Sequence, residues 1–154
     1  MIKKMLPAAL VLLPLILLSS CGYRPKANEE LYGTWTNESY GVMTSAIFMP
    51  QKEVIDASGH VAYTNISDHD PAGKGTERIA SKWIDSEGNI WYKTFGTISN
   101  GDKVLTIQTL HKLSKSATVQ EYVSVWLSKP DPNNYPTKID PKDANYRIYN
   151  RAGK

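Results

Sequence analysis

KWIDSEGNIWYK, residues 82–93, is the stretch of sequence that decides the fold. It contains two short runs rich in tryptophan, isoleucine and tyrosine, joined by a turn that ends at Gly88. Such runs on either side of a turn are typical of an antiparallel hairpin. Glycine can adopt the left-handed conformation that the last position of a three-residue turn needs. We therefore expect a hairpin at Gly88 in which Trp83 faces Trp91.

A second turn of the same form, SNG at residues 99–101, predicts the register of the next strand pair. It places Phe95 opposite Leu105 and Lys93 opposite Ile107. A two-residue turn at the same place would split the apolar face, and a slip of one residue turns every side chain to the other face. The three-residue turn is therefore the preferred interpretation.

With this register, and with Ile79 opposite Phe95 in the first hairpin, apolar side chains converge on one inner face. The residues expected around a ligand cavity are Trp83, Trp91, Phe95, Leu105, Ile107 and Trp126. An eight-stranded barrel can hold a small ligand or be filled by its own side chains. The sequence leaves both interpretations open.

The rest of the chain has the same character, with short β-rich runs broken by turn residues. The expected strands are 31–37, 44–49, 53–57, 60–66, 76–85, 89–98, 102–113, 118–127 and 145–150. Residues 68–75 are expected to form a loop, and four prolines in 129–144 argue against a central strand there. About eight strands with short connections predict an all-β domain over residues 31–151, an antiparallel up-and-down barrel whose closure removes the sheet edges.

The first twenty residues have the character of a cleaved secretory signal. Two lysines precede an uncharged run at 6–18, which is shorter than the roughly 20 residues that cross a bilayer as a helix. Leu18-Ser19-Ser20-Cys21 resembles a bacterial lipobox. The resemblance implies cleavage between Ser20 and Cys21 and lipidation of Cys21, with residues 21–30 as a polar tether. Gly22 after the cysteine favours the outer membrane of a bacterial cell envelope.

Charge and cysteine content exclude other classes of protein. The chain carries a net charge of +3, and loss of Lys3 and Lys4 with the signal would lower it to +1. We therefore expect no nucleic-acid partner. Cys21 is the single cysteine, so its lipidation would leave no thiol for a disulfide or for catalysis.

The start of the expected domain, Leu31-Tyr32-Gly33-Thr34-Trp35, resembles the Gly-x-Trp signature of lipocalins and their calycin relatives. The hairpin at 82–93 and the ending at 134–149 look like small bacterial lipoproteins that carry a lipocalin-like domain. The resemblance implies that Gly33 permits entry into the first strand and that Trp35 closes the barrel floor. It also implies that an arginine, Arg147 or Arg151, lies over that tryptophan.

Catalytic and metal-binding patterns are weak. Asp68-His69-Asp70 could offer ligands to a metal, but a solvated loop is the preferred interpretation. No nucleophile motif is found, and Glu77 shows no sign of pairing, so neither an enzyme nor a cofactor is expected. Two hypotheses follow: the barrel binds a small hydrophobic or amphipathic molecule, or segment 129–146 contacts an envelope protein or the cell wall.

Replacement of Cys21 by serine tests the anchor. The Cys21→Ser variant should remain an uncleaved precursor without lipid, because a hydroxyl cannot take up the thioether-linked diacylglycerol. Metabolic labelling with palmitate, followed by immunoprecipitation, should show label in the wild type and none in the variant. Label that persists in Cys21→Ser would show that the anchor lies elsewhere.

Overall fold

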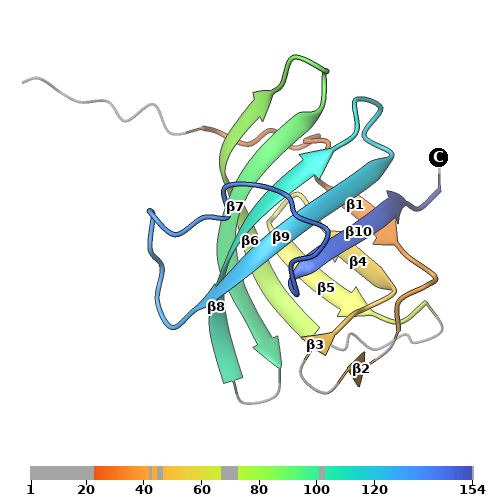
Figure 1. The fold of residues 1–154 in the computed structure, drawn as a ribbon, viewed down its shortest axis with the longest axis vertical. Helices are drawn as coiled ribbons and strands as arrows, with labels where there is room; N and C mark the ends of the chain where they lie inside the picture. Colours follow the sequence, from red (N-terminus) through yellow and green to blue (C-terminus); the bar gives the residue numbers. More distant parts are fainter. Residues whose placement is uncertain (1–22, 42, 45–46, 67–72, 101–102, 154) are drawn as a thin grey trace, which may run out of the picture.

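A closed antiparallel sheet forms the body of the computed structural model, which describes residues 23–41, 43–44, 47–66, 73–100 and 103–153 (Figure 1). The barrel strands are β1 (Gly33–Thr36), β4 (Lys52–Ile55), β5 (His60–Thr64), β6 (Gly73–Ile84), β7 (Ile90–Asn100), β8 (Lys103–Leu113), β9 (Val119–Leu127) and β10 (Tyr146–Arg151). Each pairs with the next, and β1 pairs with both β4 and β10. The predicted eight-stranded up-and-down barrel is confirmed.

Other elements are few. A ribbon of β2 (Met43–Thr44) and β3 (Ile47–Phe48) stands apart from the barrel, where one strand over 44–49 was expected. Strand β6 begins at Gly73, so the end of the expected loop 68–75 belongs to the sheet. The described residues contain no helix, and so none that is long and apolar enough to cross a membrane.

The first hairpin has the predicted geometry. Trp83 pairs with Trp91, and Gly88 has φ of +86°, in the left-handed region. The amide of Gly88 donates to the carbonyl of Asp85 at 3.0 Å and closes the turn. The expected pairing of Ile79 with Phe95 is wrong, because a β-bulge shifts the register between Ile79 and Ser81. Ile79 instead faces Thr94.

The predicted register of the second hairpin is also wrong. Asn100 pairs with Lys103, so two residues connect β7 and β8 where three were expected. Phe95 therefore faces Gln108, and Leu105 faces Ile98. The difference is an odd number of residues, and because side chains alternate along a strand it turns Phe95 to the opposite face.

Alternation along β7 shows which face is the inner one. Tyr92 and Thr94 are fully buried, whereas Phe95 is 38 % exposed. Tyr92 belongs to a buried core cluster that also includes Leu113, Tyr122 and Tyr149 from the three following strands. The inner face of the barrel is therefore the one that carries Tyr92.

One end of the barrel is closed by Trp35 and Arg151. The indole of Trp35 is fully buried and donates to the carbonyl of Leu31 at 2.9 Å. The guanidinium carbon of Arg151 lies 4.3 Å from the centre of the Trp35 ring, a cation–π contact. Gly33 has φ of +144°, and a Cβ there would lie 2.6 Å from the Arg151 side chain. The lipocalin-like expectation for Gly33 and Trp35 therefore matches the geometry, with Arg151 as the arginine.

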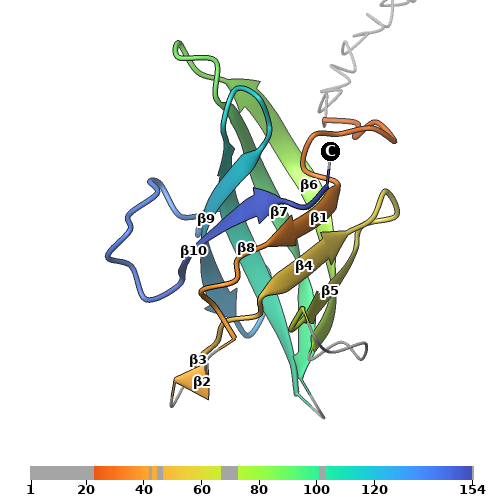
Figure 2. The same cartoon turned by 90° about the vertical axis from the view of Figure 1, so that its right-hand side faces the viewer.

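The expected tether packs partly against this closed end. Lys82 donates to Glu29 at 2.8 Å, and the hydroxyl of Tyr92 donates to Glu29 at 3.0 Å. Burial would raise the pKa of Glu29, but the hydrogen bond from Lys82 and others lower it to about 2. Figure 2 shows this N-terminal segment and the C-terminus at the same end of the barrel.

Replacement of Gly88 by alanine tests the first hairpin. A left-handed conformation costs an L-residue about 1–2 kcal/mol, so Gly88→Ala should lower the unfolding free energy by about that amount. Gly73→Ala is the matched control, because its Cβ would meet ordinary contacts of 3.7 Å or more and Gly73 has no positive φ. Urea unfolding measures both variants, and an equal loss of stability in the two would contradict the turn geometry.

Candidate functional site

The barrel interior carries an unexpectedly polar set of side chains. Because β6 to β9 are long, several successive inward positions of each strand lie inside the sheet. The buried polar residues in these and neighbouring strands include Glu53, Glu77, Thr94, Thr109, His111, Gln120, Ser124 and Arg147. We take this inner polar cluster as the candidate functional site.

Glu77 and His111 form the charged centre of the inner polar cluster. Nε2 of His111 lies 2.7 Å from Oε1 of Glu77, and the hydroxyl of Thr94 donates to the same oxygen. Burial would raise the pKa of Glu77, but the charge and hydrogen bond of His111 outweigh it and hold that pKa below its usual value. Glu77 is therefore ionised at neutral pH, although nothing in the sequence indicates its pairing with His111.

The pKa of Glu53 is shifted in the opposite direction. Burial raises the pKa of its carboxyl well above the usual value, and the nearby negative charge of Glu77 adds to the effect. The amide of Gln120 donates to Glu53 at 3.4 Å, a weak contact that opposes the shift. The barrel interior thus lowers the pKa of one buried carboxyl group and raises that of another.

Three buried polar atoms in this cluster have no hydrogen-bond partner among the described residues: Oε2 of Glu77, Nδ1 of His111 and Oε1 of Gln120. Each of these residues is at most 3 % exposed. A buried polar group left unpaired costs about 1–3 kcal/mol. Such atoms are therefore positioned to meet water or the polar group of a bound molecule.

Tyrosine rings surround the same centre. The ring of Tyr122 lies 5.2 Å from that of His111 and stacks on Tyr149 at 6.0 Å. Tyr63 is also buried, and burial is the largest cause that raises its pKa well above the usual value. The candidate site therefore combines aromatic surface with hydrogen-bonding atoms.

The structure does not bring the predicted cavity residues together. Trp83, Trp91 and Phe95 lie on the outer face, because the bulge in β6 and the register of β7 turn them outward. Leu105 and Ile107 occupy inward positions of β8, in alternation with its outer residues. Trp126 pairs with Ile107 but is 48 % exposed. The predicted single apolar face is therefore wrong.

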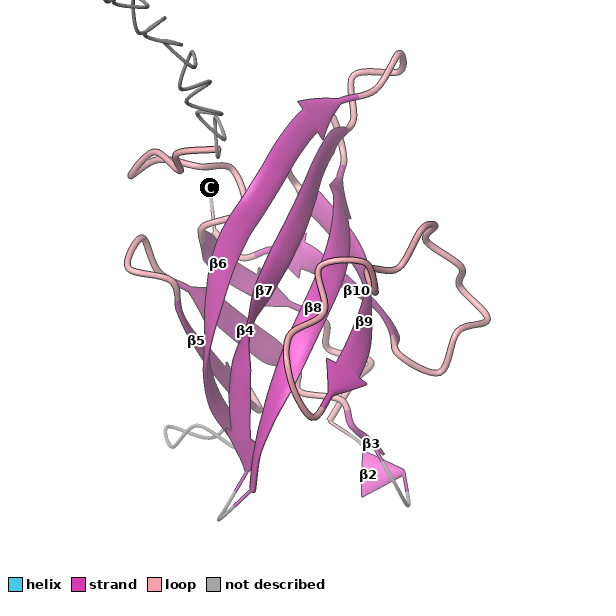
Figure 3. Ribbon diagram, turned by 90° about the vertical axis from the view of Figure 1, so that its left-hand side faces the viewer, coloured by secondary structure: helices cyan, strands magenta, loops and turns pink. Residues whose placement is uncertain are grey.

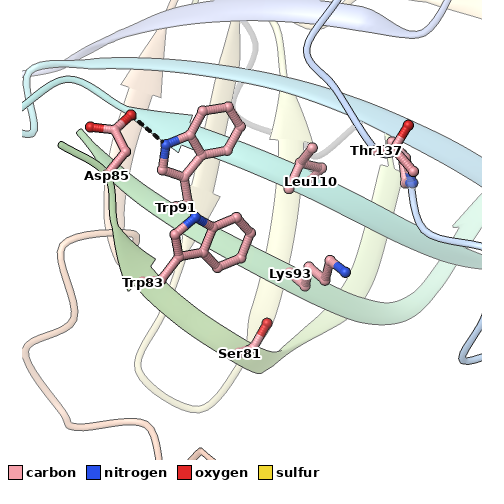
Figure 4. A pocket seen from close by; sticks show the side chains of 8 residues that line it. Ser81, Trp83, Asp85, Trp91, Lys93, Leu110 and Thr137 are labelled. Carbon is pink, nitrogen blue, oxygen red and sulfur yellow. Dashed lines mark hydrogen bonds between the residues drawn. The ribbon is translucent and has the colours of Figure 1, made fainter. Parts of the chain in front are cut away.

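The outward tryptophans line a groove of about 610 Å³ on the outside of the barrel (Figure 4). The indoles of Trp83 and Trp91 are nearly parallel, at 8°, with centres 5.8 Å apart. Leu110, Pro136 and Thr137 also line the groove, and Figure 4 shows Thr137 on the side away from the indoles.

Of the two arginines expected over the barrel floor, Arg151 takes that position and Arg147 does not. Arg147 is buried, and its guanidinium donates to the carbonyls of Ala144 and Tyr146, whereas Arg151 covers Trp35. Arginine at either position fits the sequence signature, and only the pairing of β10 with β1 distinguishes them.

The remaining site predictions fall outside the described residues. Ser20 and Cys21, the expected cleavage and lipidation positions, lie there, as does the Asp68-His69-Asp70 triplet. Among the residues that are described, no group of three or more histidine, cysteine or acidic side chains could hold a metal ion.

Sequence reasoning missed Glu53 and Gln120 and did not assign Glu77 and His111 to a site. The signal that would identify them is alternation: Gln120 shares a face with Tyr122, and Glu53 shares one with Ile55. A polar residue on an apolar face of a barrel strand indicates a buried hydrogen-bonding position.

Comparisons with family models, with curated proteins and with solved structures each find no match. Fold and site therefore define the class of protein. It is a closed eight-stranded antiparallel barrel, compatible with a lipocalin-like fold, and its polar interior could bind a small ligand.

The protonation of Glu53 predicts a pH-dependent stability. Because its pKa is raised on folding, its contribution is fully present below the unfolded value near 4.5 and is lost as pH rises. Glu77, with a lowered pKa, behaves in the opposite sense and loses its contribution as pH falls. Replacement of Glu53 by glutamine, which does not titrate, removes only the pH dependence of stability that comes from Glu53.

Glu53→Gln should therefore be more stable than the wild type at about pH 8, and the advantage should shrink towards pH 5 by up to about 1.4 kcal/mol per unit. Urea unfolding across this range provides the measurement. Glu38→Gln, which changes an exposed glutamate, should follow the wild type. A constant difference between Glu53→Gln and the wild type at every pH would refute a raised pKa for Glu53.

Proposed function

We propose that this protein is a lipid-anchored bacterial envelope lipoprotein whose barrel binds a small amphipathic molecule. The observation that carries the proposal is the group of three unpartnered buried atoms on Glu77, His111 and Gln120. A closed barrel with such atoms inside offers hydrogen bonds that its own chain leaves unused. Catalysis is not part of the proposal.

The chemistry of the inner polar cluster favours an amphipathic ligand over a purely apolar one. Oε2 of Glu77 and Oε1 of Gln120 are acceptors, so they favour a molecule with an N–H or O–H donor. The rings of Tyr63 and Tyr122 offer apolar surface to its remainder. A ligand without a donor would leave the two acceptors unpaired.

The lipobox-like segment supports the anchor. Cys21 lies only two positions before Tyr23, and residues from Tyr23 onward pack beside the closed end of the barrel. Lipids at Cys21 would therefore hold the closed end towards the membrane and leave the other end facing away. Two or more acyl chains give stable anchoring, whereas one is marginal. The outer membrane is the proposed location.

Contact of segment 129–146 with an envelope protein or the cell wall is the alternative function. One limb lies across the outside of β8 and β9, and another projects away from the barrel (Figure 3). Residues 141–144 of the segment are exposed and available to a partner.

A fluorescent probe tests ligand binding. N-phenyl-1-naphthylamine is largely apolar but carries one N–H donor, so residues 22–154, which contain every described strand, should bind it with enhanced emission. Gln120→Leu should weaken binding about tenfold, the equivalent of one lost hydrogen bond of about 1.4 kcal/mol. Glu121→Gln, a neighbour on the outer face, is the control and should bind normally.

Native mass spectrometry of the same protein provides a second readout, since a bound small molecule adds a discrete mass that denaturation removes. Absence of both probe binding and any such adduct would overturn the proposed ligand site. Equal loss of probe binding in Gln120→Leu and Glu121→Gln would place the probe outside the barrel interior.

A further inference from the structure

The outer groove contains a rigid aromatic platform. Nε1 of Trp91 donates to Oδ2 of Asp85 at 2.8 Å, and Asp85 also accepts the backbone amides of Glu87 and Asn89. The hydrogen bond from Trp91 is the largest cause that lowers the pKa of Asp85 to about 2, so the carboxylate stays ionised. The turn thereby fixes one indole, and Trp83 stacks beside it.

The far wall of the groove is also fixed in place. Gln108 lies on the outer face of β8, and its side-chain amide donates to the carbonyl of Asp131 at 2.7 Å. Its side-chain oxygen accepts the amide of Asp131 at 2.8 Å. This paired contact holds the segment that carries Pro136 and Thr137 against the barrel, so contacts within the chain itself position this wall of the groove.

Lys93 and Asp85 both line the groove, and Lys112 lies beside it at Trp91. The carboxylate of Asp85 accepts hydrogen bonds from Trp91 and Asn89, so its charge is already compensated within the turn. Nζ of Lys93 lies 5.3 Å from the ring centre of Tyr135, and Nζ of Lys112 lies 5.7 Å from that of Trp91. Neither forms a salt bridge with a carboxylate of the described residues, whereas Lys82 is paired with Glu29. Both ammonium groups are thus free to meet a negative charge.

We propose that this groove binds an acidic oligosaccharide. Figure 4 shows the faces of the two indoles turned to the same side, where they offer a flat surface to the C–H face of a pyranose ring. The hydroxyls of Ser81 and Thr137 provide hydrogen bonds for sugar hydroxyls, and Lys93 provides the charge for a carboxylate. The volume of about 610 Å³ lies within the range of small-molecule sites.

The charge complementarity commits the site to an anionic sugar. A neutral sugar would use the indoles and hydroxyls but would leave both ammonium groups unpaired. A flat aromatic anion would use the indoles and Lys93 but not the two hydroxyls. This site lies on the outer face of the sheet and is independent of the ligand proposed for the interior.

Binding is measured with the full-length protein in lipid nanodiscs, by the anisotropy of fluorescein-labelled tri-galacturonate. Saturable binding is expected, and labelled maltotriose, a neutral sugar, should bind at least about tenfold more weakly. Trp83→Ala should weaken tri-galacturonate binding about tenfold or more. Trp83 is 40 % exposed, so this variant should fold, as near-ultraviolet circular dichroism will verify.

Two further variants separate charge from stacking. Lys93→Gln should weaken binding of tri-galacturonate and leave the affinity for maltotriose unchanged. Phe95→Ala is the matched control for Trp83→Ala. It removes an exposed aromatic ring that lies outside the groove, on the same strand as Lys93, and it should bind like the wild type.

The proposal is overturned if neither sugar binds saturably, if Phe95→Ala loses as much affinity as Trp83→Ala, or if both sugars bind equally. Tighter binding of fluorescein-labelled naphthalene sulfonate than of tri-galacturonate would reassign the groove to flat aromatic anions. Gln120→Leu should not affect tri-galacturonate, so failure at this groove is distinguishable from failure of the interior site.

Discussion

Closure of the sheet through β1 is the constraint on which the rest of the structure depends. This strand has only four residues, yet it pairs with β4 on one side and β10 on the other, as Figure 2 shows. Without it the sheet would have two open edges, and water would reach the Glu77 and His111 pair. Trp35 lies in the middle of this strand, and its contact with Arg151 stabilises the closed end. Because the closing strand is so short, much of its stability must come from these side-chain contacts.

The long strands β6 to β9 differ from β1, because their inner and outer faces lie in two different environments. On β8, His111 points into the barrel, while Gln108 on the outer face holds the segment after β9 through Asp131. Leu110 lies on the outer face as well and is nevertheless buried, and it lines the groove together with Pro136 and Thr137 of that segment. The barrel wall therefore packs on both sides here, which allows a groove to form on an exterior that would otherwise be a convex surface.

The conformation of one turn was predictable from the sequence, whereas the register between neighbouring strands was not. The turn at Gly88 depends on adjacent residues, so its left-handed glycine and the pairing of Trp83 with Trp91 could be inferred. At the connection between Asn100 and Lys103 the three-residue turn was preferred over a two-residue turn because it kept one apolar face, and its register was wrong by an odd number of residues. The error placed Trp91 and Phe95 on the same face as Leu105 and Ile107, whereas the structure places them on the opposite one. Membership of the inner polar cluster depends on which face of each strand points inward. The cluster could therefore not be predicted from the sequence, although its residues can be read there. The choice between Arg147 and Arg151 likewise depends on how β10 meets β1.

The bulge in β6 explains how one strand serves both sites. Glu77 and Ile79 point inward, and strict alternation would carry Trp83 inward as well, since all three positions are odd. The extra residue between Ile79 and Ser81 reverses the alternation, so Trp83 faces outward beside Trp91. Strand β7, by contrast, pairs with β8 over its whole length without a shift, which keeps Trp91 outward and Thr94 inward. Glu77 and Trp83 are six residues apart on one strand. Because of the one inserted residue between them, the carboxylate of Glu77 lies inside the barrel and the indole of Trp83 lies outside it.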